Sequence, residues 1–224
     1  VLSLIEDSKL GVDFIDSEKL MHDFFHASHL LGKGRMDIDL HWNVFSEYSH
    51  IINSSDFVWA KAREYQWGDV ETKVLDPTHE FFLALVHGRG FDPVPPIRWV
   101  ADCLMILRKK DTKMDWVEFI GLSKKYCYSP FIKRALPYLN VCFQANIPKE
   151  VIEQIEMLLP SKGDLIYYES ISSNIRKKGV LGMTYFGIKR RFIYYGMFLK
   201  GQWPSVWHYL FSWFIHRLKS EYKK

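Results

Sequence analysis

Residues 34–45, GRMDIDLHWNVF, place two aspartates and a histidine at alternate positions of an otherwise apolar run. If residues 36–44 form a strand, alternation puts Asp37, Asp39 and His41 on one face. The other face carries apolar side chains, namely Ile38, Leu40 and Trp42. We therefore expect a core-backed strand that shows a row of metal-binding groups, with Trp42 buried on its far side.

Two interpretations of the polar face stay open. Carboxylate and imidazole groups are common metal ligands, so the face would suit a divalent ion or acid chemistry. A strand with one solvated face also shows polar residues at every second position. Asp is unfavourable in strands, however, and two aspartates spaced by two bring like charges close together. Periodicity alone does not choose between the two interpretations.

The segment before this strand predicts a β-hairpin. HASHLL and MDIDLHWNV are extended runs separated by the turn residues GKGR, so the acidic row lies on the second strand. Residues 46–68 read as a polar, partly helical connection, and DVETKVLD, residues 69–76, reads as a further short strand.

From Asp76 onward the pattern becomes helical. DPTHEFFLALVHG offers Asp76 as N-cap, Pro77 at the first helical position and Gly88 as a stop. PPIRWVADCLMILRKK spaces its apolar residues by three and four and ends in basic residues. DWVEFIGLSKKY, with Asp115 as its cap, FIKRALPYLNVCFQ and PKEVIEQIEMLL bring the expected number to at least five helices.

The composition indicates a globular chain with a sizeable core, since 48% of its 224 residues are hydrophobic. Three cysteines without CxxC spacing indicate neither a disulfide framework nor a zinc knuckle, and a reducing cytoplasm fits them best. No apolar run approaches the roughly 18 residues that span a bilayer, and the N-terminus shows no signal peptide pattern. We expect a cytoplasmic protein without a transmembrane segment.

Positive charge is concentrated in residues 161–224, which hold 12 Lys and Arg against 3 Asp and Glu, a net +9 compared with +4 for the whole chain. This basic, aromatic segment predicts contact with a nucleotide, a nucleic acid, a partner protein or an anionic membrane surface. Its last helix, expected to begin near Pro204, is apolar nearly all round, which favours packing on protein over lipid. Helices whose cations simply face water are the alternative.

Histidines occur in two further patterns. HDFFHASH, residues 22–29, spaces three of them as zinc ligands on a helix would be, but the segment runs into the predicted strand, which favours structural roles. His79 and His87 lie on one predicted helix and Asp102 on the next. A buried His–Asp hydrogen bond between neighbouring helices is the favoured interpretation over a catalytic pair.

Four segments follow one another along the chain: DIDLHWNVF, LDPTHEFFLALVHG, IRWVADCLMIL and DWVEFIGLSKKY. This order resembles a bacterial family of nucleotidyltransferases within the polymerase-beta-like superfamily, over about residues 20–140. Members carry an Asp-Leu-His-Trp strand, then a Leu-x-Pro-x-His helix with a second histidine, then an Arg-Trp-x-x-Asp helix. Motifs for common hydrolases, kinases, dehydrogenases and metalloproteases are absent.

The resemblance implies Mg²⁺-dependent nucleotidyl transfer from a nucleoside triphosphate to an unknown hydroxyl or phosphate acceptor. In the superfamily, three carboxylates on a sheet hold the divalent ion. Asp39 matches the third carboxylate and is implied as a metal ligand and catalytic residue, with Asp37 beside it in the same roles. His41 and Arg35 are the implied nucleotide contacts, and Arg98 is a further candidate for phosphate.

The sequence also departs from the family pattern. The 36 residues before Asp37 contain neither the family's Gly-rich helix start nor its Asp-x-Asp strand. The chain therefore reads as the C-terminal part of such an enzyme, or as a degenerate member, incomplete or inactive by itself. The alternative function is a non-catalytic binding module that uses the basic aromatic segment.

The expected fold class is α+β, with a small antiparallel remnant sheet and a predominantly α-helical C-terminal bundle. Residues 1–75 would form a partial nucleotidyltransferase-like α/β region, and residues 76–160 the helical bundle. Residues 161–224 would form a basic aromatic helical tail that packs on the rest.

Overall fold

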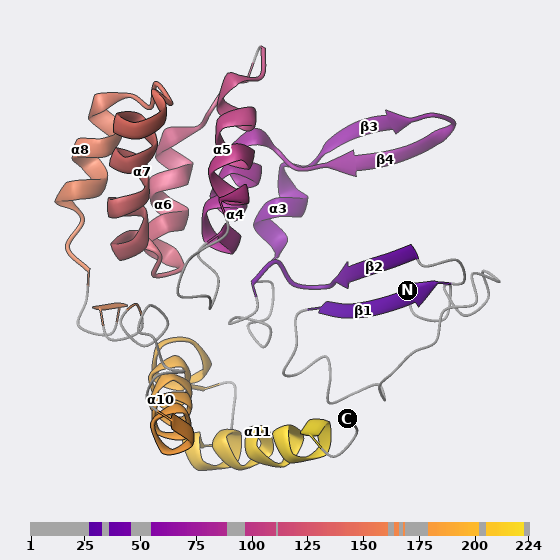
Figure 1. Ribbon diagram of the computed structural model, residues 1–224, viewed down its shortest axis with the longest axis vertical. Coiled ribbons are helices and arrows are strands. Elements are labelled where there is room, and N and C mark those ends of the chain that lie inside the picture. Colours follow the sequence, from indigo (N-terminus) through magenta and orange to yellow (C-terminus); the bar gives the residue numbers. More distant parts are fainter. Residues whose placement is uncertain are drawn as a thin grey trace. The chain divides into compact units, whose positions relative to one another are not determined.

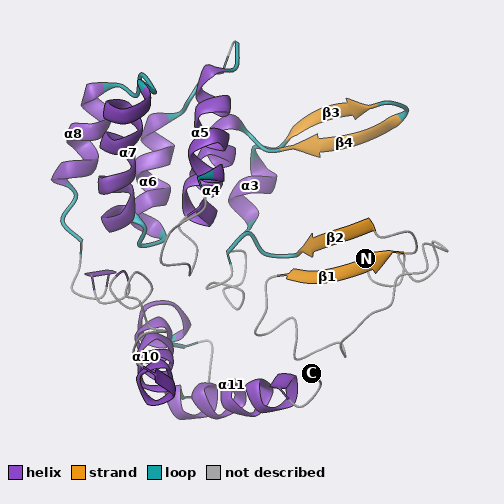
Figure 2. Cartoon of the chain, in the orientation of Figure 1, coloured by secondary structure: helices purple, strands orange, loops and turns teal. Residues whose placement is uncertain are grey.

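The computed structural model describes residues 27–32, 36–45, 55–88, 97–110, 112–160, 164–165, 168, 179–201 and 205–221 (Figure 1). The chain forms two compact units, one of residues 1–59 with 198–224 and one of residues 60–197. Helices and short antiparallel strands make up both units (Figure 2), which confirms the α+β class. The three-part division expected from the sequence stays a prediction.

A β-hairpin in the first unit confirms the strands expected around the acidic stretch. β1 (Ala27–Gly32) pairs antiparallel with β2 (Met36–His41). The unit also contains α11 (Val206–Glu221) and all but the last residue of α3 (Asp56–Ala60).

β2 is shorter than expected, and its end changes which aromatic residue is buried. The strand stops at His41, and residues 42–44 form a bend. Trp42 is only half-buried, whereas Phe45 is 1% exposed and stacks on Phe57 with ring centroids 6.0 Å apart. Because the bend interrupts the alternation of faces, the prediction of a buried Trp42 was wrong.

A second hairpin begins the other unit. β3 (Arg63–Trp67) pairs antiparallel with β4 (Val70–Val74), so the interpretation of residues 46–68 as a partly helical connection was wrong over β3. Gly68 begins the two-residue turn between the strands with φ +56°, a conformation that glycine adopts without steric cost. All five residues of β3 are exposed, so the strand has no apolar face that periodicity would reveal.

The second unit is mainly a helical bundle, and the five helices expected up to residue 160 are all present. They are α4 (Pro77–Gly88), α5 (Arg98–Arg108), α6 (Trp116–Lys125), α7 (Ser129–Phe143) and α8 (Lys149–Met157). The chain continues through α10 (Gly179–Tyr194) and the π-helix η2 (Tyr195–Leu199). The expected start of α4 at Pro77 and its stop at Gly88 are confirmed.

The core of the bundle is an aromatic cluster around α4. Nine of the 12 residues of α4 are buried, and the helix packs on both α5 and α6. The rings of Phe81 and Phe82 lie 5.4 and 6.0 Å from that of Phe119 on α6. Phe82 also contacts the fully buried Tyr128 at 6.0 Å. These contacts position the N-termini of α4 and α6 for the polar network described below.

Candidate functional site

β2 carries three of the four residues expected at the candidate site, since Asp37, Asp39 and His41 all lie within it. Alternation along the strand puts these positions on one side of the hairpin. Arg35 lies outside the described residues. The strand geometry is therefore as expected, while the roles of the residues stay a prediction.

The hairpin brings one more histidine into this row. His29 on β1 is the cross-strand partner of Asp39, and directly opposed residues of an antiparallel pair lie on the same face of the sheet. The sequence contained the signal in the two extended runs, but the pairing of 29 with 39 depends on the register, which the turn sets. Positions 29, 37, 39 and 41 thus form one row, called the β2 row below.

The residue types in the β2 row suit a hard divalent cation. Mg²⁺ prefers carboxylate oxygens and binds to one or two carboxylates together with substrate phosphates. His41, at the end of the strand, is exposed. Among the side chains that the structure describes, which do not include those of Asp37 and Asp39, no three His, Cys, Asp or Glu gather as a metal site. The β2 row is accordingly the candidate supported by strand position and residue type.

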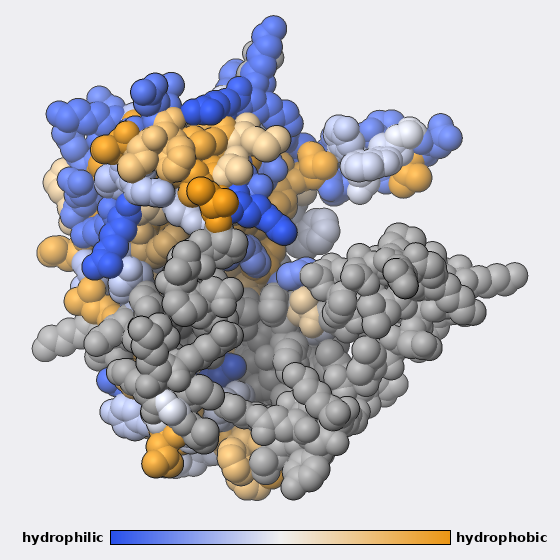
Figure 3. All heavy atoms as spheres, viewed as in Figure 1, coloured by the Kyte–Doolittle hydropathy of each residue, from blue (hydrophilic) through white to orange (hydrophobic). Residues whose placement is uncertain are grey.

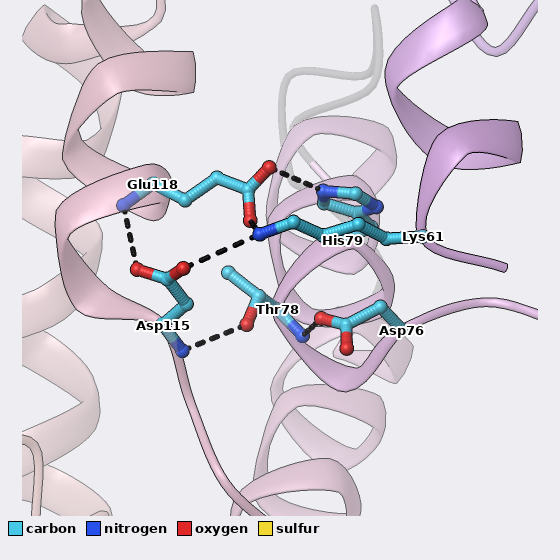
Figure 4. A network of polar contacts seen from close by, with 6 residues as sticks. All are labelled: Lys61, Asp76, Thr78, His79, Asp115 and Glu118. Carbon is cyan, nitrogen blue, oxygen red and sulfur yellow. Dashed lines mark hydrogen bonds and ion pairs between the residues drawn. The ribbon is translucent and has the colours of Figure 1, made fainter. Parts of the chain in front are cut away.

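A second polar cluster, the His79 network, joins the starts of α4 and α6 to the segment before β3 (Figure 4). His79 is fully buried, and its Nε2 lies 3.0 Å from Oε1 of Glu118. The other carboxylate oxygen of Glu118 lies 2.5 Å from Nζ of Lys61. Glu118 thus binds a buried imidazole on one side and an exposed ammonium on the other.

Helix caps complete the network. The backbone N–H of Thr78 donates to Oδ1 of Asp76 at 2.9 Å, and that of Glu118 donates to Oδ1 of Asp115 at 3.0 Å, so both expected caps are confirmed. The Thr78 hydroxyl accepts from the backbone N–H of Asp115 at 2.9 Å. The cap of one helix is therefore bonded directly to the start of the other, which fixes their relative position.

The charges of the network affect one another at the surface. The hydrogen bond to Glu118 raises the pKa of Lys61, which also lies 3.3 Å from Asp115 Oδ2. The pKa of Asp115 is lowered, chiefly by the backbone hydrogen bond from Glu118. The contribution of Asp115 to stability is therefore present above its unfolded-state pKa and is lost as pH falls through the folded-state pKa. Because these groups are exposed, the effect is small.

The partner of the buried histidine differs from the one expected. The sequence favours a hydrogen bond to Asp102 on α5, but His79 pairs with Glu118 on α6, and both His87 and Asp102 are exposed. Spacing along the chain identifies polar positions on each helix but not which helix faces His79. Arg98, the further phosphate candidate, is exposed at the first position of α5.

Removing the carboxylate of Glu118 should destabilise the fold. In Glu118→Ala the buried His79 Nε2 loses its partner, which should lower the free energy of unfolding by about 1–3 kcal/mol. Urea denaturation measures this loss. The matched control is Glu153→Ala, which breaks the exposed Lys149–Glu153 pair and should cost no more than about 0.5 kcal/mol. Equal losses in the two variants would contradict a structural role for the network.

Cys103 and Cys127 do not supply an activated nucleophile. Burial raises the pKa of the Cys103 and Cys127 thiols, and a nearby Asp164 raises that of Cys127 further. Thiols with raised pKa values stay protonated at neutral pH and react slowly. All three cysteines are free, with Cys103 buried and Cys142 exposed.

More than half of the chain matches a known protein family. Residues 8–144 match the family described as uncharacterised nucleotidyltransferase. The chain belongs to this family. The matched region runs from before β1 to the end of α7, so it includes the β2 row and the His79 network. No curated protein and no solved structure gives a significant match. The resemblance to a nucleotidyltransferase family inferred from the four ordered segments is thereby confirmed.

Proposed function

We propose that this chain takes part in Mg²⁺-dependent transfer of a nucleotidyl group from a nucleoside triphosphate to a hydroxyl or phosphate acceptor. The observation that carries the proposal is the β2 row, within a chain that belongs to a nucleotidyltransferase family. Acidic residues at alternate positions of a strand share one face, which allows both carboxylates to bind the same ion.

Asp39 and Asp37 are the proposed metal ligands and catalytic carboxylates. When bound, Mg²⁺ would neutralise charge on the triphosphate oxygens and polarise the reacting phosphorus centre. By holding the ion at β2, the two aspartates would fix the position of the triphosphate relative to the hairpin. In phosphoryl transfer, a protein contributes mainly by positioning the reacting groups and by stabilising charge on the phosphate oxygens.

Two further residues are proposed to contact phosphate. Arg35 immediately precedes β2, and a guanidinium pairs with two phosphate oxygens at once. His41 is exposed at the other end of the strand, where an imidazole N–H would donate to a phosphate oxygen. The two side chains would therefore bracket the carboxylates along the strand.

Titration of a nucleoside triphosphate with and without Mg²⁺ tests the proposal. Calorimetry should be run on residues 1–224 and on the product of the complete reading frame that contains them. Mg²⁺ should increase the affinity at least about tenfold, because the carboxylates repel a bare triphosphate and bind a metal-loaded one. The matching nucleoside, which lacks phosphates, should show no Mg²⁺ effect. The same triphosphate affinity with and without Mg²⁺ in both proteins would refute the metal role.

A further inference from the structure

α10 presents a row of exposed apolar side chains. Leu181, Tyr185, Ile188 and Phe192 are between 45% and 87% exposed and follow one another at spacings of four, three and four. This spacing places all four on one face of a helix. We call this set the α10 stripe.

α11 repeats the pattern independently in the other unit. Trp207, Phe211 and Phe214 are between 51% and 73% exposed at spacings of four and three, whereas Tyr209 is fully buried. The three exposed rings form the α11 stripe. Hydrophobic residues, coloured orange, are visible on the face of the molecule that Figure 3 shows.

Cations accompany the α10 stripe on both sides. The helix contains Lys189, Arg190 and Arg191 and has no Asp or Glu, and Arg176, Lys177 and Lys178 precede it in the sequence. At about 100° per residue, Lys189 and Arg191 fall on opposite sides of the stripe. An apolar face with long cationic side chains on either side is the pattern of a helix that lies in a membrane interface, where such side chains reach the headgroups.

The apolar circumference of α11 taken alone favours packing on protein, but the cations beside the α10 stripe make an anionic lipid surface fit better than a nucleic acid or a protein groove. In the α10 stripe the rings of Tyr185 and Phe192 alternate with Leu181 and Ile188, which offer no ring on which a base would stack, so the stripe is an interrupted stacking platform for RNA or DNA. A hydrophobic groove on a partner protein would also bind apolar side chains at this spacing, but it does not require cations on both sides of them. Aromatic residues such as Trp207 are also typical of the membrane–water boundary.

Over the part of the chain that the structure describes, no helix is long and apolar enough to cross a bilayer. We propose that α10 and α11 bind to the surface of an anionic phospholipid membrane through their two stripes. The surface would attract the cations, and the stripes would enter the boundary between headgroups and acyl chains.

Vesicle co-sedimentation of the full 224-residue chain tests this proposal. The protein should bind to vesicles of phosphatidylcholine mixed with phosphatidylglycerol and not to vesicles of phosphatidylcholine alone. Raising the salt from 0.05 to about 0.5 M should lower the partition coefficient at least about tenfold, because salt screens the attraction between cations and anionic lipids. Binding that ignores either lipid charge or salt would overturn the proposal.

Matched variants distinguish a specific effect of the α10 stripe on vesicle binding from an effect of exposed apolar residues in general. The triple variant Leu181→Ser, Ile188→Ser, Phe192→Ser should lower the partition coefficient at least about tenfold. The control Val117→Ser, Val141→Ser, Leu159→Ser changes three apolar residues elsewhere on the second unit that are at least as accessible, 81% to 94% exposed. It should bind as the wild type does, and an equal loss in both triple variants would overturn the proposal.

A second variant keeps the test decisive if the first one fails to fold. Trp207→Ser with Phe211→Ser changes two exposed rings of the other unit and should also weaken binding at least about tenfold. Wild-type affinity in this folded variant, or capture of RNA in place of vesicles, would overturn the membrane assignment. Nucleoside triphosphate titration should be unchanged in both stripe variants, so failure of this proposal is distinguishable from failure of the nucleotidyl transfer proposal.

Discussion

Asp39→Asn is expected to remove most of the Mg²⁺-dependent nucleotide binding while the fold stays intact. Asparagine keeps the shape of the side chain but removes the charge that a hard cation requires. Loss of an outer partner of a metal ligand already costs about 10–100-fold in metal affinity, so loss of a ligand itself should cost at least about 100-fold. The measurement is triphosphate titration with and without Mg²⁺, on the wild type and the variant.

The control for this substitution is an aspartate outside the β2 row. Asp69→Asn makes the same chemical change in the exposed turn between β3 and β4. Asp69→Asn should leave the nucleotide affinity unchanged. It should change the free energy of unfolding by no more than about 0.5 kcal/mol. If Asp39→Asn behaved in the same way as Asp69→Asn, the face of β2 would be a solvated surface and the catalytic interpretation would fail.

Gly88→Ala is expected to destabilise the protein more than alanine at any other glycine that the structure describes. A Cβ at position 88 would lie 1.9 Å from Cβ of Trp99 on α5, and real Cβ atoms essentially never approach others within 3.0 Å. α4 and α5 would have to separate, which should cost about 2–3 kcal/mol even after the helix preference of alanine is counted. Thermal or urea denaturation monitored by circular dichroism measures the loss.

Gly121→Ala on α6 is expected to have the opposite effect on the free energy of unfolding. Apart from the neighbouring backbone of α6 itself, a Cβ at position 121 would meet no atom within 4 Å, so alanine should stabilise the protein by up to about 1 kcal/mol. Trp99→Ala should not rescue Gly88→Ala, because the atom in closest contact is the Cβ that alanine retains. Equal stability of the Gly88 and Gly121 variants would show that α4 and α5 do not approach as closely as described.

Local signals explain the parts of the fold that could be predicted from the sequence. Asp76 and Asp115 start α4 and α6 because each carboxylate accepts a backbone N–H from the first turn of its own helix. The hairpin of β1 and β2 follows from two extended runs around a glycine-containing turn. β3 could not be recognised, since a strand exposed on both faces has no apolar period.

The residues of the candidate site also divide into those that local sequence signals predict and those that depend on long-range contacts. Asp37, Asp39 and His41 were visible because alternation within one strand is a local property. His29 joined the row only through the register that pairs it with Asp39. Glu118 was missed as the partner of His79, because the contact joins residues 39 positions apart on different helices.

The sequence by itself determined the first hairpin and the five helices between residues 76 and 160, the acidic residues of β2 and the nucleotidyltransferase family. Each of these depends on residues close together in the chain or on motifs in order. Only the tertiary structure decided that Phe45 rather than Trp42 is buried, that His79 bonds to Glu118 and that Gly88 meets Trp99. These outcomes depend on packing, because the free energy of burying a side chain is set by neighbours that come from distant parts of the chain.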